Sequence, residues 1–235
     1  GVAGGLMPVP MLNILNGGAH AATNVDVQEF MVMPHGFDSF AEGLRAGVET
    51  YHSLKAELKA DGLLGGVGDE GGFCPNLPAN EEGLKYMVRA IEGAGYSTEE
   101  MGIALDVAAT EFHHEDGYHM DGRVLSSEDL ADVYSSWLDE YPIVSIEDGF
   151  GEDDWRGWTL FTKREGHRVQ TVGDDLFVTQ SERLAQGIEI GAANAMLVKL
   201  NQVGTVTETL ESMDLATTHG FNNVISHRSG ETEDV

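Results

Sequence analysis

The sequence predicts an α/β protein whose parallel strands form a (β/α)8 barrel. Apolar strand-like runs alternate with amphipathic helical patterns, and each of the later runs ends in a charged or polar residue. Those end residues recur every 25 to 41 positions, which is one βα unit per step. An open doubly wound sheet would spread them along an edge, and no glycine-rich nucleotide fingerprint follows the first strand. A barrel gathers them at one mouth, so we favour the barrel.

The predicted elements follow one another in a regular order after a less regular start. Apolar runs at 8–15 and 30–33 precede helical patterns at 39–60 and 82–94. Further strands are predicted at 102–108, 143–148, 169–175, 195–201 and 222–227, and further helices at 127–139, 181–191 and 205–219. No repeat, linker or low-complexity tract divides the chain, so we expect a single domain over residues 1–235.

The chain is strongly acidic, which argues against a nucleic-acid partner. The chain has 40 Asp and Glu against 13 Lys and Arg, a net charge of −27. Such a surface repels phosphate backbones, so a nucleic-acid partner is not expected. The acidic residues are spread along the whole chain, which favours a folded surface adapted to a high-salt cytoplasm, where screening relieves self-repulsion.

The apolar pattern and the cysteine content indicate a cytoplasmic globular protein. No run of 18 apolar residues occurs, so we expect no membrane span, and no export signal is visible. The single cysteine, Cys74, excludes an internal disulfide and a cysteine-based metal cluster. This usage suits a reducing compartment.

Three carboxylates end successive predicted strands: Asp106, Glu147 and Asp174. Oxygen-rich groups of this kind suit Mg²⁺, with water and substrate oxygens completing an octahedron. A single acid near a strand end is more often a solvated turn residue, especially in a chain this acidic. The regular spacing of the three favours a metal site.

Lys199 lies in the apolar run AMLVKLNQVG, in a chain with few lysines. Two interpretations stay open from the residues alone. The amine is either a structural counter-ion to the carboxylates or a base that removes a proton next to a metal-bound carboxylate.

Other polar residues cluster near glycines. Glu70 lies in the glycine-flanked segment LLGGVGDEGGFCPN, where the backbone can approach a ligand closely, although such loops are most often flexible turns. His20 follows a GG pair, and Gln28 and Glu29 begin a predicted strand. The histidine-rich segment 113–123 has two DG pairs, which favours an exposed hairpin over a metal site.

Taken together, the motifs give the chain a close resemblance to the enolase family. They run in family order over the whole chain: PVPMLNILNGGAHA, DVQEFMVMP, GDEGGFCPN, ALDVAATEF, SIEDGFGEDDW, VGDDLFVT, LVKLNQVGTVTET and SHRSGETED. The resemblance implies an enolase-type, TIM-like barrel that is incomplete, since the family's N-terminal α+β domain and last barrel segment have no counterpart here. It also implies a hydro-lyase that reversibly dehydrates 2-phosphoglycerate to phosphoenolpyruvate in glycolysis and gluconeogenesis.

The resemblance also assigns residue roles. Asp106, Glu147 and Asp174 are implied Mg²⁺ ligands, Lys199 the base and Glu70 the general acid. The implied substrate-binding residues are His20, Gln28, Glu29, His227, Arg228 and Ser229.

The resemblance finally carries expectations about assembly and location. It implies a homo-oligomer, dimeric or octameric, in the cytoplasm, with a secondary occurrence at the cell surface or outside the cell. We expect the 235 residues to be inactive alone, because an unclosed barrel exposes strand edges. Two alternatives remain open: another Mg²⁺-dependent dehydratase of acid sugars, and a non-catalytic surface binding protein on an enolase scaffold.

Overall fold

The computed structural model describes residues 7–227. They fall into two compact units, each described here by itself: unit 1 comprises the chain up to Leu105 together with Trp137–Val144, and unit 2 comprises the rest. Seven strands are hydrogen-bonded in the order β1-β2-β3-β7-β8-β9-β10, and β3 and β7 contribute residues to both units. The described helices include none that is both long and apolar enough to cross a membrane.

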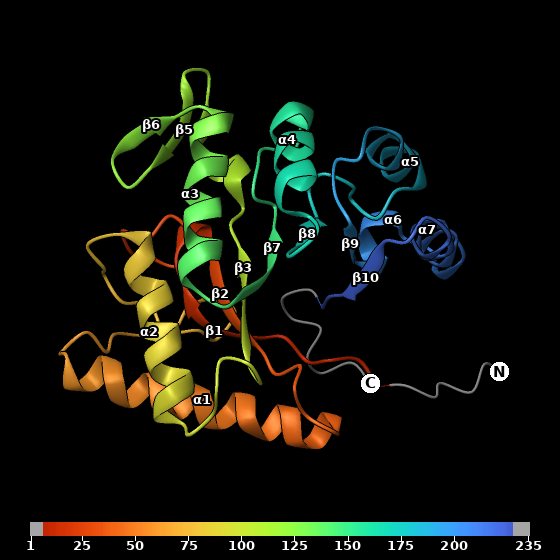
Figure 1. Ribbon diagram of the computed structural model, residues 1–235. Coiled ribbons are helices and arrows are strands. Elements are labelled where there is room, and N and C mark those ends of the chain that lie inside the picture. Colours follow the sequence, from red (N-terminus) through yellow and green to blue (C-terminus); the bar gives the residue numbers. More distant parts are fainter. Residues whose placement is uncertain (1–6, 228–235) are drawn as a thin grey trace. The chain divides into compact units, whose positions relative to one another are not determined.

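Unit 1 consists of an antiparallel strand pair, two long helices and most of a third strand. Its elements are β1 (Leu12–Asn16), the short helix η1 (Gly18–His20), β2 (Glu29–Met33), α1 (Phe40–Ala60), α2 (Asn80–Gly93) and β3 (Gly102–Asp106). The Ser39 hydroxyl accepts the Glu42 N–H at 3.2 Å and so caps α1. Helices α1 and α2 pack against each other and bury Leu54, Leu58 and Ile91 (Figure 1).

Unit 2 contains the regular βα alternation and a small separate sheet. Its elements, some shared with unit 1, are η2 (Ala109–Phe112), β4 (His113–His114), β5 (Gly117–Met120), β6 (Arg123–Leu125), α3 (Ser127–Glu140), β7 (Ile143–Glu147), α4 (Trp155–Glu165), β8 (Gln170–Gly173), α5 (Ser181–Ile190), β9 (Ala195–Val198), α6 (Leu200–Val203), α7 (Val206–Thr218) and β10 (Asn222–Ile225). Strands β7 to β10 are all parallel (Figure 1). Their carboxyl ends therefore lie at one edge of the sheet.

Two details depart from the predicted elements. Helix α4 has no counterpart among the predicted helices; the Asp154 carboxylate caps it by accepting the Gly157 N–H at 2.9 Å, and Trp158 and Phe161 bury one side. The strand predicted at 195–201 ends at Val198 instead. Lys199 is the N-cap of the single-turn helix α6. It therefore lies at the junction between strand β9 and helix α6.

A cluster of buried aromatic side chains lies in the core of unit 2. Phe150 is 1% exposed, and its ring centroid lies 5.8 to 6.2 Å from those of Tyr118, Tyr134, Trp158 and Phe161. Edge-to-face and tilted pairs at these distances add attraction beyond the area they bury. Phe150 follows the Glu147-Asp148 turn at the end of β7, so this packing also holds that turn.

The substitution Phe150→Ala tests the role of this cluster. We expect it to lower the free energy of unfolding by about 3–5 kcal/mol, because it leaves a cavity among the four rings. Urea unfolding at constant KCl measures the change. Val124→Ala, at a side chain that is 53% exposed, serves as control and should alter stability by less than about 0.5 kcal/mol. Equal losses in the two variants would contradict this view of the core.

Candidate functional site

In unit 2, predicted site residues stand at the carboxyl ends of adjacent strands. Asp106 and Glu147 are the last residues of β3 and β7, and Asp174 directly follows β8. All three are buried, with 7 to 8% exposure. The backbone ladder continues past the strand ends, where the Val107 N–H donates to the Glu147 carbonyl at 2.9 Å. The strand register therefore places the three carboxylates along the same edge.

Lys199 makes a direct ion pair with Asp174. The Lys199 ammonium donates to one carboxylate oxygen of Asp174, and the Gln202 side-chain amide donates to the other at 2.8 Å. The Lys199 backbone N–H donates to the Thr179 hydroxyl at 3.0 Å, which fixes the start of α6. The ion pair is the contact expected of a structural counter-ion to Asp174. The same contact holds the Lys199 amine at the sheet edge that carries the carboxylates, where a base would also be needed.

Asp148 is a buried acid that the sequence analysis did not single out. Its carboxylate oxygens accept the backbone N–H groups of Asp174 at 3.0 Å and Asp175 at 2.9 Å, so it ties the β7 turn to the β8 turn. Burial raises the pKa of Asp148 well above its usual range, and the charges of Asp174, Asp106 and Asp175 raise it further. The sequence offered one indication that Asp148 belongs to the site, namely its position directly after Glu147 in the motif IED.

The donor chemistry of this edge fits a hard divalent cation. One carboxylate oxygen each from Asp148, Asp174 and Asp175 lies within 4.8 Å of the other two. Burial and the neighbouring carboxylate of Asp174 raise the pKa of Asp175 as well, so adding negative charge here is costly and adding a cation is favourable. The trio predicted from sequence, with Asp106 and Glu147 beside Asp174, is not among the described groups that meet this distance, and its ligand role remains a prediction.

Unit 1 brings together a second set of predicted residues: His20, Glu29 and Glu70. His20 ends η1, Glu29 begins β2, and Glu70 lies in the glycine-rich turn at 65–72. The His20 Nδ1 atom lies 3.0 Å from a Glu29 carboxylate oxygen, and one ligand atom from each of the three residues lies within 4.8 Å of the others. All three are half-buried. The set can therefore hold a proton between an imidazole and carboxylates.

Asn16 is a buried residue that contacts the chain segments carrying Glu29 and Glu70. Its side-chain N–H donates to the Gln28 carbonyl at 3.2 Å, and its backbone N–H donates to the Phe73 carbonyl at 2.8 Å. A Cβ at Gly72 would come within 2.4 Å of the Asn16 amide oxygen, so only glycine fits there. Asn16 thus joins the start of β2 to the turn that carries Glu70, a role that only the three-dimensional contacts reveal.

Four predicted residues remain: Gln28, directly before β2, and three that lie at or beyond the end of the described chain. His227 is exposed and follows β10, where the Ser226 N–H donates to the Val198 carbonyl at 3.0 Å, one residue before Lys199. Arg228 and Ser229 lie outside the described residues. Gln28 is half-buried, and its carbonyl also accepts the Gly17 N–H at 3.0 Å.

Parallel strands joined by helices carry carboxylates and a lysine at their carboxyl ends, which is the arrangement found at the mouth of a (β/α)8 barrel. Residues 5–235 match the family model described as "Enolase, C-terminal TIM barrel domain". The chain therefore belongs to this family. The match confirms the predicted barrel fold class.

The substitution Gly72→Ala tests the packing of the Glu70 turn. We expect a loss of about 1–3 kcal/mol in unfolding free energy, because the new methyl group collides with Asn16. Urea unfolding measures the loss. The matched control is Gly66→Ala in the same turn, where an added Cβ meets nothing within 4 Å and stability should be unchanged or slightly higher. A stable Gly72→Ala protein would show that the turn does not depend on this contact.

Proposed function

We propose that the protein is an enolase, a hydro-lyase that interconverts 2-phosphoglycerate and phosphoenolpyruvate in glycolysis and gluconeogenesis. Membership of the enolase barrel family supports the general class. The observation that carries the specific proposal is Lys199, one of only five lysines, whose amine is held against Asp174 at the carboxylate-rich strand ends.

In this proposal Asp106, Glu147 and Asp174 are the residues that would hold Mg²⁺, and the substrate group that the cation would assist is the carboxylate. When bound, Mg²⁺ supplies positive charge that stabilises the negative charge developing on that carboxylate. The burial of all three carboxylates supports this role, because burial strengthens their attraction for a cation. Lys199 takes the proton from C2 of the substrate.

Glu70 is the proposed general acid, which protonates the C3 hydroxyl as it leaves as water. The close approach of His20 and Glu29 to Glu70 supports a proton-handling role for this set. Gln28 and His227 contact the substrate in the same proposal. Arg228 and Ser229 bind the phosphate, for which a guanidinium fork is well suited.

We further propose a cytoplasmic homo-oligomer, dimeric or octameric, that works at high salt. The net charge of −27 supports the salt requirement, because screening is needed to offset self-repulsion among so many carboxylates.

Lys199→Ala tests the proposed base. We expect kcat for phosphoenolpyruvate formation to fall by about 10²–10⁴-fold, the usual range for losing a positioned base. The assay uses the polypeptide encoded by the whole gene, with Mg²⁺ and high KCl, and it runs the 235-residue chain in parallel to test our expectation that this chain is inactive alone.

Lys163→Ala, in helix α4, is the matched control, and its kcat should be unchanged. Wild-type turnover by Lys199→Ala would refute the assignment of the base. No turnover of 2-phosphoglycerate by the wild-type polypeptide encoded by the whole gene would refute the proposed reaction itself.

A further inference from the structure

The hairpin formed by β4 and β5 carries two histidines on its outward face. In the β4–β5 register His113 pairs with Tyr118 and His114 with Gly117, so His114 and His119 lie on the face opposite to Tyr118. Tyr118 is buried, whereas His114 and His119 are both exposed. Residue 117, which pairs with His114, is a glycine and adds no side chain on this face. The hairpin predicted from the sequence is thus present, with its histidines sorted between two faces.

The two outward rings lie close together, and one is held by a carboxylate. The centroids of His114 and His119 are 4.4 Å apart with 64° between the ring planes. The His119 Nε2 atom lies 2.8 Å from an Asp116 carboxylate oxygen. The third histidine is engaged elsewhere, since His113 stacks on Tyr118 with 4.2 Å between centroids.

We propose that His114 and His119 form a surface site for a borderline divalent transition metal such as Zn²⁺, Ni²⁺ or Cu²⁺. Imidazole nitrogen suits these metals, whereas Mg²⁺ prefers oxygen ligands. Metal–nitrogen bonds of about 2.0–2.1 Å place two ring centres roughly 4.5 Å apart when the bonds meet at a right angle, and roughly 5.2 Å apart at the tetrahedral angle that Zn²⁺ prefers. The observed separation of 4.4 Å is close to both values, and rotation of the two exposed side chains about their own bonds brings one nitrogen of each ring to a shared ion, with water filling the other positions.

Asp116 acts on the metal through His119. A ligating histidine commonly donates its second ring N–H to a carboxylate, which fixes the tautomer and raises the basicity of the ligating nitrogen. The contact between Asp116 and His119 Nε2 leaves Nδ1 as the ligating atom of that ring. The net charge of the chain adds a general attraction for cations. This site is separate in composition from the carboxylates at the strand ends and does not depend on the proposed reaction.

Titration calorimetry of the protein with Zn²⁺ in excess Mg²⁺ tests the proposal, since Mg²⁺ occupies oxygen-rich sites. We expect a Zn²⁺ site that both His114→Gln and His119→Gln abolish, whereas these substitutions leave any binding at His20, Glu29 and Glu70 unchanged. Asp116→Asn should weaken binding at His114 and His119 by about 10–100-fold, the usual cost of losing such a carboxylate partner. Cu²⁺ added to the wild-type protein should show two nitrogen ligands in its electron paramagnetic resonance spectrum.

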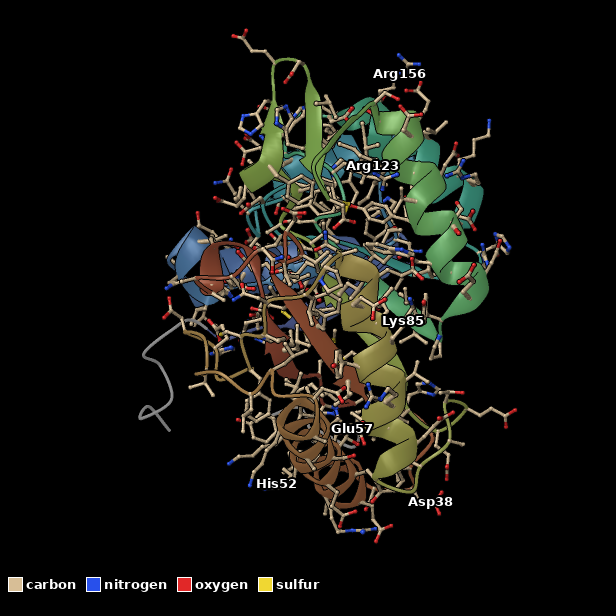
Figure 2. The ribbon with its side chains drawn as sticks, turned by 90° about the vertical axis from the view of Figure 1, so that its left-hand side faces the viewer. Asp38, His52, Glu57, Lys85, Arg123 and Arg156 are labelled. Atoms are coloured by element: carbon tan, nitrogen blue, oxygen red, sulfur yellow. The ribbon has the colours of Figure 1, made fainter. Side chains whose placement is uncertain are left out.

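His52→Gln is the matched control, because this exposed histidine lies on α1, outside the hairpin (Figure 2). It should leave the Zn²⁺ affinity unchanged. The substituted side chains are exposed, and circular dichroism confirms that each variant is folded. Wild-type Zn²⁺ binding by either His114→Gln or His119→Gln, or no Zn²⁺ site in the wild-type protein, would overturn the proposal.

Discussion

The concentration of carboxylates at the ends of β7 and β8 is the constraint on which the candidate site depends. Asp148 is buried among acidic neighbours, and its pKa is raised accordingly. Two kinds of contact offset this cost: backbone N–H groups donate to Asp148, and Lys199 and Gln202 donate to Asp174. Because burying charge without partners is costly, this edge stays assembled only while those donors remain in place.

The donors are supplied by the regular part of the fold. Parallel pairing of β7, β8 and β9 brings the strand ends into register, and the N-cap of α6 fixes Lys199. Aromatic packing around Phe150 also helps to hold the turn after β7. In unit 1, the buried side chain of Asn16 likewise supports a turn that carries a candidate site residue, Glu70. In both units, strands next to the turns therefore fix the positions of the candidate site residues that the turns carry.

The strand ends of unit 2 could be predicted from the sequence, but the contacts between them could not. Apolar runs that end in a polar residue located Asp106, Glu147 and Lys199 at carboxyl ends, because strand alternation is a local property. The roles of Asp148 and Asn16 depend on backbone groups far along the chain. Helix α4 was not predicted, because its sequence WRGWTLFTKRE combines Gly157 and aromatic residues, which have low helix propensity, with polar residues. Burial of Trp158 and Phe161 stabilises this helix.

Binding of a divalent cation by the carboxylates at the strand ends is the proposal on which the proposed reaction depends. The most direct test compares urea unfolding with and without MgCl2 at constant ionic strength, in the wild-type protein, Asp106→Asn and the exposed control Asp38→Asn. The account predicts that Mg²⁺ at about 100 times its Kd stabilises the wild-type protein and the control by about 2.7 kcal/mol, and that Asp106→Asn loses most of this gain. An equal gain in Asp106→Asn, or none in the wild-type protein, would contradict it.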